Sequence, residues 1–294
     1  MAIPTETVYG LAANALQTEA VAKVFEVKDR PMFDPLIVHI STITQVEQYA
    51  SAFPDQAKRL AEKFWPGPLT LVLPRRKLVP DLTTAGLDTV GLRCPDHAIT
   101  LSLLRQLDFP LAAPSANPFG YISPTTPQHV QDQLENKIKF ILDGGPCLVG
   151  VESTIVGFED GEIVIHRLGG VGIEEIEAIA GKMKLDLNSS SNPLTPGKLL
   201  SHYAPKKKII IGNLNELLRR HYSLEVGVLS FKTFYHAQHS LMLSPSGSLE
   251  EAARNIFSML RELDQAPVDL ILAEYVPDVG LGKAINDRLR RATR

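Results

Sequence analysis

Short apolar runs rich in branched residues alternate with stretches of helical periodicity, and this alternation restricts the possible folds most. Residues 36–40, 69–74 and 140–143 are predicted strands, because each run is short, apolar and bounded by proline or glycine. Residues 18–28 and 54–64 are predicted helices, because their apolar side chains recur at helical spacing. Elements mixed in this way indicate an α/β or α+β domain built around a central sheet.

A polar run rich in serine and asparagine, residues 187–193, interrupts this pattern and predicts a linker. After it the alternation restarts, with predicted strands at 208–212, 226–230 and 269–273 and predicted helices at 249–264 and 281–292. Such a pattern is typical of a smaller, Rossmann-like α/β domain with a chiefly parallel sheet. We therefore expect a first domain at 1–187, a linker at 188–206 and a second domain at 207–294.

Composition excludes several classes of protein. The 294 residues are 44% hydrophobic and 21% charged, which suits folded domains with packed cores. The formal net charge of −3 argues against a strong, sequence-independent binder of nucleic acid. Cys94 and Cys147 form no CxxC pair, so neither a disulfide framework nor a zinc site is indicated, and both are expected to be buried as small apolar residues.

The chain also lacks the segments that direct proteins to membranes. None of its apolar runs approaches the ~20 residues that a membrane-spanning helix needs. Its start shows no basic stretch followed by an apolar one, so export is not expected. We expect a cytoplasmic protein that does not bind membranes.

Four short motifs are weak. Residues 280–285 begin like a dinucleotide-binding loop but lack its third glycine, and residues 197–199 read Gly-Lys-Leu, which is not a P-loop. His236 and His239 have a metal-like spacing without a third ligand nearby, so a solvated loop is expected. The basic end of the chain, 288–294, is expected to complement a helix dipole and to face water.

Three polar clusters interrupt otherwise apolar strand ends, and they are the candidates for chemistry. They comprise residues 4–11 with 28–31, residues 91–95, and residues 113–118 with 123–125 and 150–155. Each has an ordinary structural interpretation when taken singly. Pro-Ser-Ala-Asn-Pro is a turn sequence, and isolated cations fit helix ends or the surface.

Taken together, the clusters fit one task. A polyanionic nucleotide needs cations of fixed geometry and small hydroxyl or amide donors on tight loops, and the chain offers these at Lys28, Arg30, Ser115, Asn117 and Ser123. The carboxylate of an amino acid needs a planar fork of donors, for which Arg93 is the candidate.

These motifs carry a family resemblance. PTETVYGL, KDRPMFDPLIVHI, WPGPLTLVLP, VGLRCPDH, PLAAPSANPFGYISPT and DGGPCLVGVESTIV resemble the Sua5/YciO/YrdC family of threonylcarbamoyl-AMP synthases, over about residues 2–170. Residues 195–205 and 280–291 resemble the linker and the last helix of the two-domain Sua5 form. The fold implied is a YrdC-like twisted mixed sheet with helices, followed by the smaller parallel domain.

The resemblance implies an enzyme that joins L-threonine, bicarbonate and ATP into threonylcarbamoyladenylate and pyrophosphate, with Mg²⁺ held by the ATP phosphates and not by dedicated protein ligands. A separate transferase would then carry the group to adenosine 37 of tRNAs that read ANN codons, with tRNA bound weakly if at all. The main alternative is a non-catalytic, RNA-binding or translation-associated relative. A YciO-like relative with another small-molecule activity is a second, less favoured one.

The resemblance also assigns roles to single residues. Matched motif by motif, the catalytic set is Lys28, Arg30, Ser115 and Asn117. Threonine would be held by Thr7, His39, Arg93, Ala113 and Ser153. ATP would contact Arg30, Asp34, Thr89, Ser115, Ser123, Arg167 and, from the linker, Tyr203, so that the linker closes over the cavity.

The sequence departs from the family pattern twice. The family usually has a further strand and helix before PTETVYG, and here that motif begins at Pro4, so we expect either that the start is assigned late or that the segment is absent. The run 166–169 reads His-Arg-Leu-Gly where the family more often has arginine, proline and glycine, so we expect a less rigid loop after Arg167.

Overall fold

The structure is a computed structural model that describes residues 1–159, 161–187 and 203–293. Its helices are α1 (Thr18–Lys28), α2 (Val46–Tyr49), α3 (Asp55–Phe64), α4 (Asp81–Thr84), α5 (Ala98–Gln106), α6 (Pro127–Leu134), α7 (Ile173–Ala180), α8 (Leu214–Arg220), α9 (Leu249–Gln265) and α10 (Leu281–Ala292). Its strands are β1 (Ala2–Ile3), β2 (Gly10–Leu11), β3 (Ala13–Asn14), β4 (Ile37–His39), β5 (Leu69–Pro74), β6 (Thr89–Arg93), β7 (Leu111–Ala112), β8 (Thr154–Glu159), β9 (Glu162–Arg167), β10 (Met183–Leu185), β11 (Ile209–Ile211), β12 (Val226–Ser230), β13 (His239–Met242) and β14 (Leu270–Ala273).

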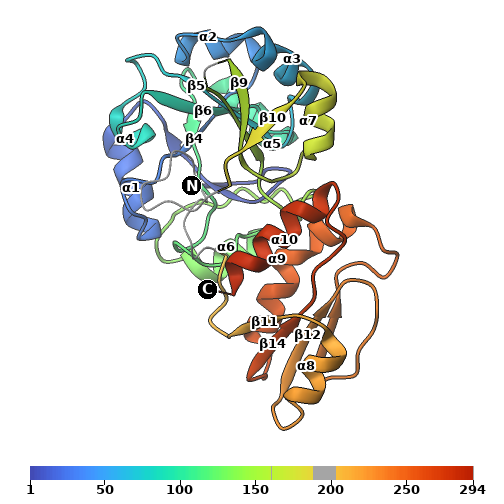
Figure 1. Ribbon diagram of the computed structural model, residues 1–294. Coiled ribbons are helices and arrows are strands. Elements are labelled where there is room, and N and C mark those ends of the chain that lie inside the picture. The colour runs from blue at the N-terminus through green and yellow to red at the C-terminus, as the bar shows by residue number, and fades with distance from the viewer. Residues whose placement is uncertain (160, 188–202, 294) are drawn as a thin grey trace.

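Among the described residues these strands form two main sheets, one in each lobe of the molecule (Figure 1). The large sheet has eight strands in the order β10-β9-β8-β5-β6-β4-β7-β3 and mixes parallel with antiparallel pairs. The small sheet has four strands in the order β11-β14-β12-β13, and every pair in it is parallel. The predicted fold class, a twisted mixed sheet followed by a smaller parallel domain, is confirmed.

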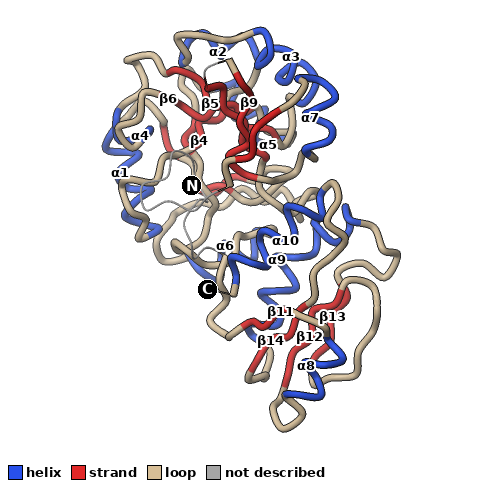
Figure 2. The backbone as a smooth tube through the Cα atoms, in the orientation of Figure 1, coloured by secondary structure: helices blue, strands red, loops and turns tan. Residues whose placement is uncertain are grey.

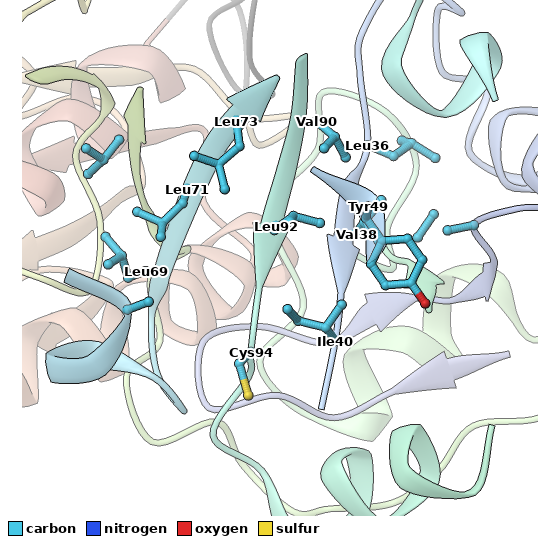
Figure 3. Close-up of a cluster of buried hydrophobic side chains, with 14 of the residues drawn as sticks. Leu36, Val38, Ile40, Tyr49, Leu69, Leu71, Leu73, Val90, Leu92 and Cys94 are labelled. Carbon is cyan, nitrogen blue, oxygen red and sulfur yellow. The ribbon is translucent and has the colours of Figure 1, made fainter. Parts of the chain in front are cut away.

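The core of the first lobe lies on one face of the large sheet. Because side chains alternate along a strand, Leu69, Leu71 and Leu73 of β5 point to the same face. Figure 3 shows them beside Val90 and Leu92, in one buried cluster. Each leucine buried in this way stabilises the fold by about 1.5–3 kcal/mol.

The same alternation turns polar residues to the opposite face. β4 and β6 are parallel neighbours, with Val38 opposite Leu92 and His39 opposite Arg93. Since Val38 and Leu92 lie in the core cluster, His39 and Arg93 point together to the other face. Both residues are the last of their strands, so they lie side by side at the carboxyl ends of β4 and β6.

Helix α1 ends in a buried cation, Lys28. Val21, Val24, Phe25 and Lys28 are its buried residues, and their spacing places them on one face of the helix. Lys28 is the last helical residue, and Asp29 ends the helix in the left-handed conformation, at φ 53°. The chain then continues directly into Arg30.

The second lobe packs against the first through α9 and α10, which lie at the junction between the two lobes (Figures 1 and 2). Val8, Ile122 and Val151 of the first lobe belong to the same hydrophobic cluster as Ile256 and other residues of the second. Gly150, at φ +81°, faces the backbone of α9, and an added Cβ would lie 2.4 Å from the Ala253 oxygen. The junction is therefore a packed apolar core.

Several expectations from the sequence need correction. Residues 140–143 do not form a strand; Ile141 makes only an isolated bridge to Ala2, because a neighbouring strand does not continue there. His239 lies in the first position of strand β13 and pairs with β12, so the loop expectation holds for His236 alone. The predicted burial of Cys94 and Cys147 is confirmed.

The basic end of the chain also differs from the prediction. Arg288 is 0% exposed and Arg291 is 8% exposed, whereas Arg290 faces water. They are buried because α10 packs between the two lobes, which a local charge pattern cannot indicate. The linker prediction falls largely on residues 188–202, which lie outside the described residues, and the domain boundaries stay predictions.

Candidate active site

A cavity lies over the polar face of the large sheet, where β4 and β6 end. It is lined by Val8, Arg30, Ile37, His39, Arg93, Ala113, Pro114, Ser115, Glu152, Arg167 and Tyr203. Seven of these residues were predicted from the sequence: Arg30, His39, Arg93, Ala113, Ser115, Arg167 and Tyr203. Side chains from positions 30 to 203 of the chain thus converge on a single concave surface.

Arg93 is held in place by the loop that follows β1. Its Nη2 donates to the Thr7 hydroxyl over 2.8 Å and lies 2.7 Å from the Glu6 carboxylate. Thr7 in turn shares a hydrogen bond of 2.8 Å with Thr5. The buried Nε of Arg93 has no hydrogen-bond partner among the described residues. Because a buried donor without a partner is costly, the geometry favours an anionic ligand at this guanidinium.

His39 is a neutral group in this cavity. Burial lowers its pKa to about 3, and the positive charge of Arg93 beside it adds to the effect. The imidazole therefore remains uncharged at neutral pH. It offers a ligand a hydrogen-bonding group without adding a second cation next to Arg93.

Lys28 lies behind the cavity and is absent from the residues that line it. Its Nζ donates to the carbonyl oxygens of Ser115 and Asn117, both at 2.5 Å. Burial and then the charge of Arg30 lower its pKa well below the ordinary value. The side chain thus holds the 113–118 loop through these two carbonyls, and its predicted contact with phosphates stays a prediction.

Asp34 is likewise absent from the residues that line the cavity. Its carboxylate lies 2.8 Å from Nη2 of Arg30, and the carbonyl of Pro35 accepts a hydrogen bond of 3.0 Å from the same nitrogen. Burial raises the pKa of Asp34, and the charge of Arg30 opposes this rise. This ion pair fixes Arg30, which does line the cavity, and the predicted contact of Asp34 with ATP stays a prediction.

The 113–118 loop carries Ser115 into the cavity wall and uses Asn117 to keep its shape. The Asn117 amide donates to the carbonyls of Pro118 and Tyr121, at 2.9 and 2.8 Å. Its Oδ1 is buried and has no hydrogen-bond partner in the described part of the chain. The loop thus presents the Ser115 residue to the cavity that Arg30 also lines, whereas Asn117 is not among the lining residues.

Two further predicted residues, Ser153 and Ser123, do not line the cavity but contact residues that do. Arg167 donates to the carbonyl and the hydroxyl of Ser153, at 2.9 and 3.0 Å, so Ser153 orients Arg167. The hydroxyl of Ser123 donates to the Glu152 carboxylate over 2.6 Å. Ser153 and Ser123 are both fully buried, and they reach the cavity through Arg167 and Glu152.

Thr89 does not share this cavity. It begins β6 whereas Arg93 ends it, so the two lie on the same face about 13 Å apart along the strand. Thr89 lines a neighbouring cavity with Thr70 and Gly91, and Ile37 borders both cavities. The predicted contact of Thr89 with ATP stays a prediction.

Sequence reasoning missed two acidic residues of the site. Glu6 was part of the PTETVYGL motif and Glu152 of the VEST run, but neither was assigned a role. Their buried positions beside arginines explain them, because a buried carboxylate needs a cationic partner. A signal was available in each case: an acid within an otherwise apolar and hydroxyl-rich run that also contains turn residues.

Two further properties concern metals and membranes. Among the described residues, His, Cys, Asp and Glu nowhere gather in groups of three that would suit a metal ion. Within the same residues, the helices are too short or too polar to cross a membrane.

The comparisons with known proteins agree with this geometry. A sequence model of the Sua5/YciO/YrdC family, described as telomere recombination, matches residues 1–169. A second model, described as the C-terminal domain of threonylcarbamoyl-AMP synthase, matches residues 171–293. Threonylcarbamoyl-AMP synthase of Pyrococcus abyssi is 42% identical over 308 residues, which cover 100% of this chain and 90% of that protein. The Bacillus subtilis protein of the same name is 42% identical over 306 residues, covering 99% and 88%.

Solved structures lead to the same group of proteins. The crystal structure of P. abyssi Sua5 complexed with L-threonine has a TM-score of 0.94 at 42% identity, covering 99% of this chain and 89% of that one. Escherichia coli YciO, at 24% identity and a TM-score of 0.52 over 57% of this chain, shows a shared fold alone.

Proposed function

The chain belongs to the Sua5/YciO/YrdC family, and on that premise we propose that its cavity makes L-threonylcarbamoyladenylate from L-threonine, bicarbonate or CO₂, and ATP, with release of pyrophosphate. One observation carries the proposal. Arg93 with an open donor, neutral His39, and the cationic Arg30 and Arg167 line one cavity. The carboxylate of an amino acid and the phosphates of a nucleoside triphosphate both need cations of fixed geometry. The reaction between the two substrates requires that they are bound side by side.

The Arg93 side of the cavity suits threonine. The guanidinium meets the amino-acid carboxylate, since its Nε is buried without a partner among the described residues and its Nη2 is fixed by Glu6 and Thr7. His39 beside it is neutral and avoids repelling the amine. Ala113 is small, which leaves room for a branched side chain.

The reaction has two bond-forming steps. The threonine amine attacks CO₂, loses a proton and becomes a carbamate. A carbamate oxygen then attacks the α-phosphorus of ATP, and the bond to pyrophosphate breaks. Arg30 and Arg167 lie where they can offset the charge that builds on the phosphates. Holding the short-lived carbamate against the phosphate supplies much of the acceleration.

Mg²⁺ fits this site as a companion of the ATP phosphates. Oxygen ligands are those it prefers, and the Ser115 hydroxyl in the cavity wall is an oxygen that would suit it beside the phosphates. When bound, the ion would neutralise part of the phosphate charge. Lys28 and Asp34 support this arrangement through the loop and through Arg30.

The product needs an acceptor. An acyl-adenylate is a reactive mixed anhydride that water destroys, so a transferase must take it up soon after it forms. We propose that a separate transferase passes the group to adenosine 37 of tRNA, since the net charge of −3 does not favour tight binding of tRNA by this chain. Tyr203, which lines the cavity, would limit the access of water to the adenylate.

The test is pyrophosphate release by the full chain with ATP, L-threonine and bicarbonate. We expect release to require all three substrates and to stop when L-threonine is replaced by L-valine, which lacks the hydroxyl. Release that proceeds equally without threonine or bicarbonate would contradict the proposal, as would a complete lack of release with threonine bound.

A further inference from the structure

One buried cation of the second lobe, Arg288, contacts a residue that lines the cavity. Arg288, on α10, is 0% exposed. Its Nε donates to the Glu152 carboxylate over 2.9 Å, and its Nη2 donates to the carbonyl of Leu168 over 2.8 Å. Its Nη1 donates to Asp287 on the same helix, also at 2.9 Å. The guanidinium therefore ties two separate segments of the first lobe to the last helix.

The carboxylate that Arg288 holds is part of the active site. Glu152 lines the cavity, and each of its oxygens has a different partner. Oε2 accepts from Arg288, and Oε1 accepts from the hydroxyl of Ser123 over 2.6 Å. A chain of contacts thus runs from α10 through Glu152 to Ser123, the residue that sequence reasoning placed at ATP.

The same arginine supports a second piece of the wall. The guanidinium of Arg288 lies 5.0 Å from the centre of the Tyr203 ring, and that ring stacks on Phe257 of α9 at 5.4 Å. Tyr203 is 1% exposed and lines the cavity. Two cavity residues from distant parts of the chain thus share one support.

The charge of Arg288 also bears on the protonation of Glu152. Burial alone would raise the pKa of this carboxyl, but Arg288, Arg167 and the hydrogen bond from Ser123 together hold it below its usual value. Tyr203 and Asp287 are the other titratable groups around the pair. Without Arg288, the carboxyl would keep Arg167 as its cation and would take up a proton at higher pH.

We propose that Arg288 is a positioning residue of the active site, which fixes Glu152 and Tyr203 in the wall on the nucleotide side of the cavity. The second lobe is then part of the catalytic apparatus and not an accessory module. This inference rests on the proposed function, because it assigns the Glu152 side of the cavity to ATP.

The experiment measures steady-state pyrophosphate release and its pH dependence for the full-length chain and two variants. We expect Arg288→Met to raise the KM for ATP about tenfold or more, with the KM for threonine within about twofold. The acidic limb of its activity profile should move to higher pH, because Glu152 is then protonated earlier. Arg288→Lys keeps a cation beside Glu152, so the acidic limb of its activity profile should lie where that of the wild type lies. Its KM for ATP should fall between the values of the wild type and of Arg288→Met.

Two controls separate positioning from docking of the lobes. Lys283→Met removes an ion pair between α10 and Glu174, which spans the same junction away from the cavity. Arg290→Met removes an exposed cation from the same helix. Both should leave the ATP KM and the pH limb unchanged.

The outcomes distinguish the two proposals. If the wild-type chain lacks release that depends on threonine, the proposed function itself fails. If the wild type is active and Arg288→Met matches Lys283→Met, or raises both KM values equally without moving the pH limb, the inference is overturned. Should Arg288→Met fail to fold, Arg288→Lys decides: an ATP KM equal to that of the wild type would overturn the inference.

Discussion

At the scale of single residues, three buried ion pairs hold the charged side chains of the site in place. Glu6 fixes Arg93, Asp34 fixes Arg30, and Arg288 fixes Glu152. A buried charge without a partner is strongly destabilising, so removing one member costs more than the contact itself. Substitutions that keep the charge but change its shape are therefore the more informative ones.

Arg93→Lys tests the assignment of Arg93 to threonine. An ammonium can still pair with Glu6, so the free energy of unfolding should fall by only about 1 kcal/mol. It cannot present two donors to a carboxylate, so threonine binding should weaken about tenfold or more while binding of an ATP analogue stays within about twofold. Isothermal titration of both ligands measures this, with Arg105→Lys as the exposed control. Loss of nucleotide affinity with threonine spared would reverse the division of the cavity.

His39 makes stability depend on pH. Its pKa is about 3 when folded and about 6.5 when unfolded. Between these values the unfolded chain binds a proton that the folded chain excludes, so stability falls as pH decreases from 6.5 toward 3. From pH 7 to pH 5, wild type should lose about 2 kcal/mol more than His39→Gln. Urea unfolding at both pH values measures the difference, and parallel losses would show that His39 titrates normally in the folded state.

At the scale of elements, the last turn of α1 supports the 113–118 loop. Lys28→Met leaves the carbonyl of Asn117 without its donor and that of Ser115 with only the backbone N–H of Asn117, so unfolding should become easier by about 1–3 kcal/mol. Lys23→Met, exposed on the same helix, should change stability by less than about 0.5 kcal/mol. Unchanged stability with a large fall in kcat would instead mean that Lys28 acts on the phosphates directly, as the sequence motif implied.

Helix α9 approaches the first lobe where Gly150 lies. The left-handed φ of +81° already disfavours other residues, and a Cβ would meet the α9 backbone. Gly150→Ala should destabilise the chain by about 3 kcal/mol or more, against about 1 kcal/mol for Gly181→Ala, which has φ +83° and open space around it. Equal effects in thermal or urea unfolding would mean that the helix can shift to accommodate a methyl group.

At the scale of the whole molecule, the two lobes share one hydrophobic cluster. A chain that ends at Leu187 would uncover Val8, Ile122 and Val151. We expect this truncated chain to bind a hydrophobic dye more strongly and to have a higher KM for ATP, because Glu152 also loses Arg288. Truncation with unchanged dye binding and kinetics would show that the first lobe is self-sufficient.

The sequence by itself determined much of the architecture. The apolar run at 69–74 and the helices at 18–28 and 281–292 match the structure because they depend on local periodicity alone. The ordered motifs also indicated the family, and seven of the residues named from them line one cavity. These elements and motifs depend on short stretches of chain, so the spacing and type of the residues are sufficient to predict them.

Only the tertiary structure decided which charged side chains line the cavity and with which partners the buried ones pair. In the structure Lys28 bonds the 113–118 loop and Asp34 pairs with Arg30, partners that the motifs did not indicate, and Arg288, which was expected in water, is fully buried. An arginine at residue 288 pairs with a glutamate at residue 152 because α10 packs on the first lobe. Burial and pairing depend on neighbours brought together over more than a hundred residues, and no local pattern contains that information.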